Sequence, residues 1–219
     1  MKKRNFTLVE LLVVIGILAI LAGLIIPAVI SSKRQGKIAT ARADMSSISA
    51  AFEHMNKEYG TMAKSDGSST YKLGGVSFTK SSNGDITIGE LSGNKYTSSA
   101  KTDYCKVIAE LCVPEKITPS LNKKNIKMLD PKKEYDASKG PTEGDNPDHT
   151  WLDPWGNPYM IRINVDSSET LTDPSKSDKK LSARIILWSL GPDGKGADAY
   201  GDDTNKDNIA SWKDGDWLN

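Results

Sequence analysis

The sequence predicts an α+β fold in which a long N-terminal helix packs on a small antiparallel sheet, with an extended loop near the C-terminus. Three observations support this prediction. An uncharged run occupies residues 11–30, an apolar stripe at helical spacing continues to residue 59, and strand-like segments fill the last third of the chain. The chain has 219 residues, so the part outside a membrane segment can form one modest domain with its own core.

The uncharged run fits the thickness of a membrane. As a helix it would be roughly 30 Å long at about 1.5 Å per residue, and Lys2, Lys3 and Arg4 precede it. A cleaved secretory signal would have a shorter apolar core of about 7–15 residues, followed by a small-x-small site that this sequence lacks. A plain membrane anchor with its basic residues in the cytoplasm explains everything except the acid Glu10 at the start of the run.

The residues around Glu10 suggest a third interpretation. Phe-Thr-Leu-Val-Glu-Leu-Leu, residues 6–12, resembles the N-terminus of type IV pilins and type II secretion pseudopilins. The resemblance implies that a prepilin peptidase cuts between Asn5 and Phe6 and methylates the new Phe6 amine. The family usually has Gly where this chain has Asn5.

The same resemblance implies an arrangement in the membrane. Residues 1–5 would be the leader, and residues 6–30 a transmembrane and assembly helix with a kink near Pro27. The protein would cross the inner membrane once, with the N-terminus cytoplasmic and the C-terminal domain periplasmic.

Glu10 would serve assembly in such a protein. A carboxylate near lipid costs a few kcal/mol, so it usually has a partner. Cleavage after Asn5 would create a positive amine on Phe6, about one helical turn from Glu10. Glu10 of one chain could bind the Phe6 amine of its own chain or of a neighbour, which would fix axial register. The alternative is that Glu10 reaches the membrane interface alone.

Residues 31–60 continue the helix in amphipathic form. One apolar stripe follows spacings of three and four residues and predicts a face that packs on a sheet, with a coiled-coil dimer as the alternative. Gly60 follows as a C-cap, and His54 lies off the stripe, where we expect it to be solvated. The stripe contains Ile38, Ala41, Met45, Ile48, Phe52, Met55 and Tyr59.

Residues 61–150 are rich in turns and look like a variable insertion compared with small pseudopilins. We expect strands at residues 76–78 and 86–88, with Asn83-Gly84 between them as a hairpin signal. A helix is predicted over residues 102–111, and a charged, proline-containing loop over residues 123–148.

The two cysteines, Cys105 and Cys112, leave two possibilities open. If the segment is helical, they lie on one face roughly 10 Å apart, too far for a disulfide. If it is irregular, they could form a bridge outside the cytoplasm.

Residues 151–219 contain the predicted C-terminal strands and an acidic loop. Asp-Pro-Trp-Gly-Asn-Pro-Tyr, residues 153–159, predicts a rigid turn that presents Trp155 and Tyr159 to a core. Strands are expected at residues 160–165 and 184–190, paired across a polar loop.

Aspartates are dense after the second of these strands. Like charges at this density repel one another unless they are solvated or bind a cation, and their hard oxygens suit Ca²⁺. An EF-hand loop would need Gly where Asn208 stands and prefers Glu where Asp214 stands. The acidic residues are Asp193, Asp198, Asp202, Asp203, Asp207 and Asp214.

Three C-terminal segments, residues 153–159, 189–194 and 207–212, resemble the major pseudopilin of type II secretion, in which this loop binds calcium. The resemblance implies that Leu190 supplies a carbonyl and that Asp193 and Asp207 supply carboxylates. Asn208 stands where the family tends to have a further Asp, and Asp202 or Asp203 could replace that ligand. A solvated loop without metal is the alternative.

These features predict a structural subunit rather than an enzyme. The resemblance implies a type II secretion pseudopilus, in which the chain assembles with itself into a helical filament. Its other partners would be the prepilin peptidase, minor pseudopilins, the inner-membrane assembly platform and the membrane itself. A type IV pilus pilin and a membrane-tethered enzyme or binding module are the alternatives. The formal charge of +1 includes three leader positives, which leaves 1 − 3 = −2 after cleavage, so no nucleic-acid partner is expected.

Overall fold

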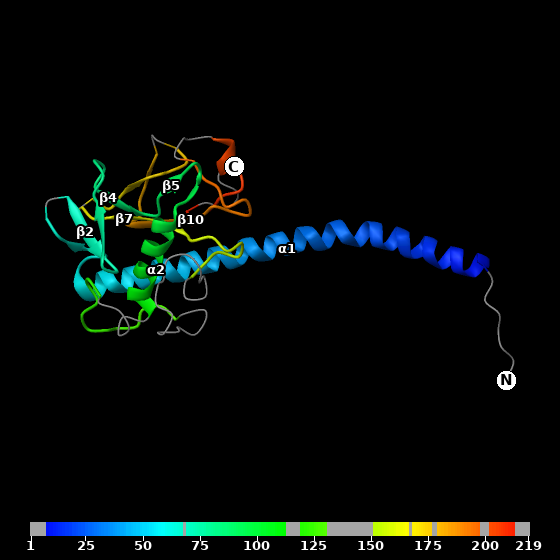
Figure 1. Ribbon diagram of the computed structural model, residues 1–219, viewed down its shortest axis with the longest axis horizontal. Helices are drawn as coiled ribbons and strands as arrows, with labels where there is room; N and C mark the ends of the chain where they lie inside the picture. Colours follow the sequence, from blue (N-terminus) through cyan, green and yellow to red (C-terminus); the bar gives the residue numbers. More distant parts are fainter. Residues whose placement is uncertain are drawn as a thin grey trace. The chain divides into compact units, whose positions relative to one another are not determined.

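The computed structural model divides into two compact units, Met1–Ala39 and Thr40–Asn219. The N-terminal helix α1 (Leu8–Tyr59) contributes residues to both units. Figure 1 shows the elements in chain order. The residues that the structure describes are 8–67, 69–112, 119–130, 151–166, 168–176, 179–197 and 202–212.

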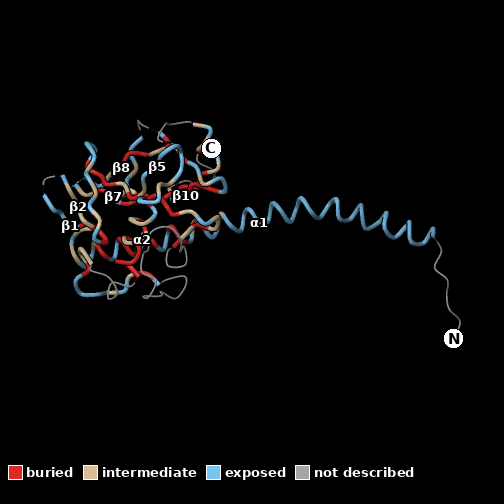
Figure 2. The backbone as a smooth tube through the Cα atoms, viewed as in Figure 1, coloured by how far each residue is buried: buried red, intermediate tan, exposed pale blue. Residues whose placement is uncertain are grey.

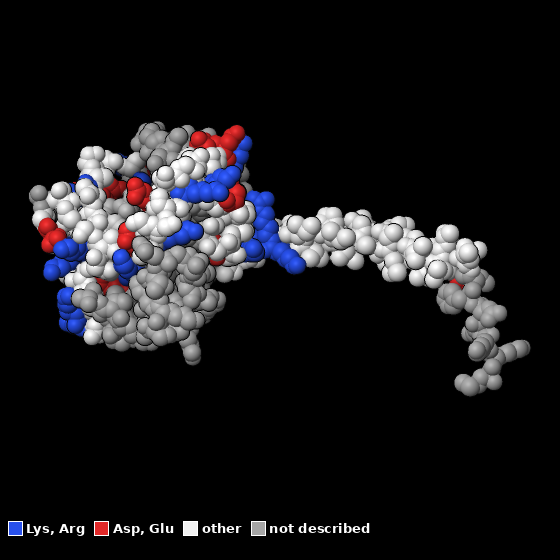
Figure 3. All heavy atoms as spheres, viewed as in Figure 1, with Lys and Arg blue, Asp and Glu red and all other residues white. Residues whose placement is uncertain are grey.

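In the first unit, α1 exposes its apolar side chains on every face. Residues 8–37 are all exposed, as Figure 2 shows, and the helix continues through Pro27. Figure 3 shows a stretch almost without charge, and the sequence places Lys33, Arg34 and Lys37 after it. By length and composition, this helix can cross a membrane. The exposed apolar surface agrees with the expectation that lipid or neighbouring chains cover the first half of α1.

In the second unit, the predicted stripe of α1 is buried against the small antiparallel sheets. Met45, Ile48 and Phe52 are completely buried, whereas Tyr59 at the end of the stripe is half-buried and His54 is exposed, as expected. Gly60 ends the helix with φ +73° and donates to the Asn56 carbonyl at 2.7 Å. The further buried residues of α1 are Ala41, Asp44, Ala51 and Met55.

A four-stranded antiparallel sheet runs in the order β11-β10-β7-β4. The two strands predicted in the last third pair as expected, with Leu187 opposite Ile161. Every residue of β10 is buried, which fits its continuous apolar sequence. The strands are β4 (Asp85–Ile88), β7 (Met160–Asn164), β10 (Ile185–Ser189) and β11 (Ile209–Ala210).

The predicted hairpin at Asn83-Gly84 is wrong. Both expected strands form, but β3 (Val76–Thr79) pairs with β2 (Thr70–Leu73), and β4 pairs with β7. Gly74 and Gly75 join β2 to β3 with φ of 60° and 76°, the positive values that a two-residue hairpin needs. Asn83-Gly84 instead turns the chain from one sheet to another. The first sheet also contains β1 (Lys64–Ser65).

The second helix, α2 (Ser98–Cys112), confirms the predicted helix and begins four residues earlier. Thr97 Oγ1 accepts a hydrogen bond from the Ala100 amide at 3.0 Å and caps the helix start. The helical spacing keeps Cys105 and Cys112 apart, and both thiols are free. Two short hairpins complete the described fold, β5 (Leu91–Ser92) with β6 (Lys95–Tyr96), and β8 (Leu171–Thr172) with β9 (Lys180–Leu181).

The predicted loop over residues 123–148 is described as far as residue 130, where it forms turns and irregular backbone. The rest of that prediction lies outside the described residues. The hairpin β8–β9 lies where a plain polar loop was expected between the last two long strands.

Candidate functional site

The predicted processing site, Asn5 and Phe6, lies outside the described residues. Glu10 lies in the first turn of α1 and is exposed. The next acidic residue in the sequence is Asp44, so Glu10 is the single acid of the apolar half of the helix. This placement agrees with a carboxylate at the edge of a membrane segment.

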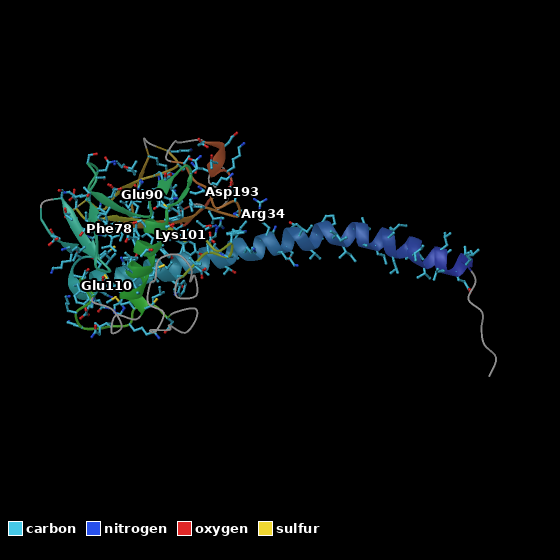
Figure 4. All side chains as sticks on the ribbon, in the orientation of Figure 1. Arg34, Phe78, Glu90, Lys101, Glu110 and Asp193 are labelled. Atoms are coloured by element: carbon cyan, nitrogen blue, oxygen red, sulfur yellow. The ribbon has the colours of Figure 1, made fainter. Side chains whose placement is uncertain are left out.

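The loop after β10 begins with a tight turn. The Gly191 carbonyl accepts a hydrogen bond from the Gly194 amide at 3.3 Å, and Pro192 occupies the second position of the turn. A Cβ atom on Gly191, where φ is +67°, would lie 2.3 Å from the Asp207 carbonyl oxygen. Only glycine therefore fits here. The turn places Asp193 beside Asp207, with the Asp193 amide 3.4 Å from Asp207 Oδ2; Figure 4 labels Asp193.

The Asn208 side-chain amide lies next to this turn. With Nδ2 toward the carbonyl oxygens of Leu190 and Lys195, it donates to both at 3.2 Å. In the reverse orientation Nδ2 donates to Asn205 Oδ1 at 2.9 Å. The Asn205 amide is fixed by two hydrogen bonds of 2.9 Å with the backbone of Ala197. The orientation toward the two carbonyls makes two hydrogen bonds and leaves one oxygen–oxygen contact, whereas the reverse orientation makes one hydrogen bond and leaves two such contacts.

The carbonyl and carboxylate oxygens of this loop are the kinds of ligand that a hard cation takes. Ca²⁺ accepts backbone carbonyls, amide oxygens and carboxylates in flexible geometry. The carbonyls of Leu190 and Lys195 and the Asn208 amide oxygen would be joined by the carboxylates of Asp193 and Asp207. In the described part of the chain, no three His, Cys, Asp or Glu side chains gather to hold a metal. A site here would depend on neutral oxygens, which suits calcium better than a transition metal.

Asp202 and Asp203 have other partners. Asp202 Oδ1 accepts from the Thr204 amide at 2.8 Å and caps the short helix η3 (Asp203–Asn205). The Thr204 hydroxyl and amide lower the pKa of Asp202 below its usual value. Asp203 is exposed and forms an ion pair of 2.7 Å with Lys206. Asp198 and Asp214 lie outside the described residues.

The turn at residues 153–159 is joined directly to this loop. Asp153 Oδ2 accepts from the Ser189 hydroxyl at 2.5 Å, and Oδ1 accepts from the amides of Trp155 and Asn157 at 3.0 and 2.7 Å. Asn157 Nδ2 donates to the Gly191 carbonyl at 3.1 Å. Burial raises the pKa of Asp153, against these hydrogen bonds. The turn therefore supports the loop as well as the core.

The aromatic residues of the turn differ in burial. Tyr159 is completely buried, as expected, and donates to Asp44 Oδ2 at 2.8 Å. Trp155 is only half-buried. The sequence named Asp153 only as the first residue of the turn, and it gave no role to Ser189 or to the Lys195 carbonyl. No local pattern pointed to them, because every residue carries a carbonyl and the Asp153–Ser189 contact spans 36 positions.

Comparison with known proteins identifies the N-terminus. Residues 1–26 match the model of the prokaryotic N-terminal methylation motif. The chain is 42% identical over 52 residues to Type II secretion system core protein G of Pseudomonas aeruginosa. The match covers 24% of this chain and 37% of that protein, so the chain spans well under half of this relative's length.

No solved structure matches the chain significantly. The matching stretch is nevertheless specific, because it contains the segment in which Glu10 follows the basic residues Lys2, Lys3 and Arg4. The chain carries a prokaryotic N-terminal methylation motif and resembles a type II secretion core protein over a short N-terminal stretch, which confirms the resemblance predicted from residues 6–12.

Proposed function

We propose that this protein is a structural subunit of a type II secretion pseudopilus. One observation carries the proposal: the methylation motif at residues 1–26 leads into a helix whose apolar side chains are exposed on every face. Exposed apolar surface of this extent marks a membrane or protein interface. The similarity to core protein G favours secretion over a type IV pilus, which is the second candidate because the N-terminal motif fits both.

Processing and assembly follow from the positions of the charges. The peptidase cuts between Asn5 and Phe6, removes the basic residues with the leader and leaves one positive amine. Glu10 then binds the methylated Phe6 amine of a neighbouring chain. Each addition pairs two charges that are costly near lipid, and it sets the axial position of the incoming chain.

The surroundings follow from the same proposal. Residues 6–30 cross the inner membrane, the C-terminal unit folds in the periplasm, and the filament grows on the inner-membrane assembly platform with minor pseudopilins. The apolar half of α1 exchanges lipid for the helices of neighbouring chains as it enters the filament.

The test compares Glu10→Gln with Glu53→Gln, an exposed control on the same helix, in a bacterium that has a type II secretion system. The Glu10→Gln chain should stay in the inner membrane, but chemical cross-linking should no longer yield a ladder of its multimers. The control variant should remain in the membrane and yield the ladder. Normal ladders in Glu10→Gln would remove its assembly role. If the wild-type chain is recovered only as single copies cross-linked to other filament proteins, it is a minor subunit.

We further propose that Ca²⁺ binds the loop through Leu190, Lys195, Asn208, Asp193 and Asp207. The supporting observation is that the turn after β10 places Asp193 beside Asp207, with the Asp193 amide 3.4 Å from Asp207 Oδ2. Bound calcium would join the segment before β11 to the end of β10. It would stabilise the subunit by about 2.7 kcal/mol when free calcium is 100 times the Kd.

A calcium titration of the full chain in detergent tests this site. The melting temperature should rise with millimolar calcium and less with magnesium, because Mg²⁺ demands a stricter octahedral geometry. Asp207→Asn should abolish the rise. Asp203→Asn, which removes a surface ion pair of the same loop, should keep it. An unchanged wild-type melting temperature would contradict the calcium site.

A further inference from the structure

We infer that Lys33, Arg34 and Lys37 form a basic collar on α1 that binds the phosphate groups of anionic phospholipids. The inference rests on the proposed function, because it takes the apolar half of α1 to lie in the inner membrane. The collar would then meet the periplasmic leaflet and hold the subunit there before assembly.

The collar lies where the apolar half of α1 ends. No charged residue stands between Glu10 and Lys33 in the sequence. All three collar side chains are exposed. Figure 3 shows Lys and Arg gathered at the end of the uncharged stretch, and Figure 4 labels Arg34. An α-helix turns by about 100° per residue, so the three side chains lie within about 100° of one another on one face of the helix.

The distance along the helix places these charges at the level of the lipid phosphates. Ile30 is the last large apolar side chain before the collar and is 64% exposed. At about 1.5 Å per residue, Lys33 lies about 4–5 Å and Lys37 about 10 Å beyond Ile30. The headgroup layer on each side of the hydrocarbon core is about 5–7 Å thick. Long Lys and Arg side chains bend along the helix, which brings their charges within this layer.

The charges on the two sides of the apolar run call for such a partner. Lys2, Lys3 and Arg4 precede the run, and the three collar residues follow it. The positive-inside tendency disfavours basic residues on the translocated side of a membrane helix. The collar therefore opposes the proposed orientation unless a contact on that side stabilises it. Since the proposed cleavage removes the first three residues, the collar contains the first basic side chains of the processed chain.

A neighbouring copy of α1 offers the collar fewer partners than lipid does. The acidic residues of α1 after the collar are Asp44, Glu53 and Glu58. Asp44 is buried and accepts a hydrogen bond from Tyr159. Glu58 forms an ion pair with Lys124. Phospholipid phosphates, by contrast, surround a membrane helix on every side at the depth of the collar. The charges therefore favour lipid as the partner.

The experiment measures the lipid that stays bound to the full chain. The chain is reconstituted in vesicles with equal amounts of phosphatidylglycerol, which is anionic, and phosphatidylcholine, which is not. It is then captured in mild detergent, and mass spectrometry gives the ratio of the two bound lipids. The collar variant combines Lys33→Gln, Arg34→Gln and Lys37→Gln.

The matched control combines Lys57→Gln, Lys95→Gln and Lys101→Gln, which remove three exposed charges from the second unit. Both variants keep the basic residues before the apolar run, so a difference between them belongs to the collar. One Lys or Arg near an anionic surface changes binding about fivefold, so the collar variant should lower the ratio of phosphatidylglycerol to phosphatidylcholine about fivefold or more. The control should change the ratio less than about twofold, because its charges lie outside the apolar half of the helix.

An equal lipid ratio in the wild type and the collar variant would overturn the inference. If that variant keeps the ratio but loses the ladder of cross-linked multimers, the collar binds a neighbouring chain instead of lipid. The lipid measurement needs no filament. A wild type that prefers phosphatidylglycerol but gives no ladder would therefore contradict the proposed function alone.

If the collar variant does not insert into vesicles, the salt dependence of the wild type decides. Its preference for phosphatidylglycerol should fall as salt during capture rises from about 0.01 M to 1 M, because the Debye length shrinks from about 30 Å to about 3 Å. A preference that does not change with salt would overturn the electrostatic contact.

Discussion

The phenol of Tyr159 donates a hydrogen bond of 2.8 Å to the carboxylate of Asp44, and both side chains are buried. This contact joins the turn before β7 to the packed face of α1 across 115 positions of sequence. Tyr159→Phe should destabilise the fold by about 1.5–3 kcal/mol, because a hydrogen bond to a buried carboxylate is lost. Urea unfolding of the full chain in detergent measures the change.

Tyr71→Phe is the matched control for that variant. Its hydroxyl lies 3.5 Å from the Val165 carbonyl in a half-buried position, so its loss should change the free energy of unfolding by less than about 0.5 kcal/mol. An equal loss of unfolding free energy in the two variants would show that the hydrogen bond to Asp44 does not stabilise the fold more than the weak contact of Tyr71.

Glu110 on α2 should be indispensable as a carboxylate. It is completely buried and accepts hydrogen bonds from the amides of Leu121 at 2.6 Å, Asn122 at 2.9 Å and Gly74. Glu110→Gln would turn an NH₂ group toward one of these donors and should cost about 1.5–3 kcal/mol of stability. Glu90→Gln is the exposed control and should be neutral; Figure 4 labels both residues. A neutral Glu110→Gln would contradict this network.

Gly74 and Gly75 should respond very differently to alanine. Both have positive φ, so either substitution introduces backbone strain of about 1–2 kcal/mol. At Gly75 a Cβ meets nothing within 4 Å, whereas at Gly74 it would lie 2.4 Å from the Lys106 carbonyl oxygen. Gly74→Ala should therefore lose about 1–3 kcal/mol more in urea unfolding. Equal losses would mean that α2 does not pack closely on this turn.

Alkaline pH should weaken the fold in two stages. Burial raises the pKa of the Cys112 thiol from 9.0 to about 12, and burial also raises the pKa values of the Tyr104 and Tyr159 phenols. In each case the unfolded state loses its proton first. Stability is therefore complete below about pH 9 and falls as pH rises, by about 1.4 kcal/mol per pH unit for each such group. The slope should steepen above about pH 10, where unfolded tyrosines ionise.

Urea unfolding between pH 7.5 and 11 measures these slopes. Cys112→Ala should lower the slope by about 1.4 kcal/mol per pH unit throughout the range from pH 9 to 11, and the steepening above about pH 10 should remain. An unchanged slope in that variant would assign the early loss to another group.

Local patterns predicted both long helices and the positions of the strands β3, β4, β7 and β10, because periodicity and turn residues lie within a few positions of one another. The two-residue strands and β2 carried no such pattern. The stripe from Ala41 to Met55 and the cap at Gly60 are of this kind. Strand pairing was predictable only where strands follow each other closely, as β7 and β10 do. The Asn83-Gly84 signal failed because β4 pairs with β7, more than 70 positions away, and no local feature of β4 specifies that partner.

The candidate site also has a part that the sequence predicts and a part that only the fold reveals. The residue types at Asp193, Asp207 and Asn208 are visible in the sequence, and the structure brings Asp193 beside Asp207 and Asn208 to Leu190. Backbone carbonyls carry no sequence signal, so Lys195 could not be found. The link from Asp153 to Ser189 depends on how two distant turns meet, which only the folded chain specifies.

The strand order β11-β10-β7-β4 has a consequence for how the chain matures. Its inner strands, β7 and β10, lie after residue 159, so β4 has no partner in this sheet until most of the chain has been synthesised. Until then, Met45, Ile48 and Phe52 on α1 lack the cover that the finished fold gives them. Under the proposed topology, a chain halted partway through translocation would expose this apolar face of α1 at the membrane surface. Such a precursor would depend on periplasmic chaperones and would be a natural substrate for quality-control proteases.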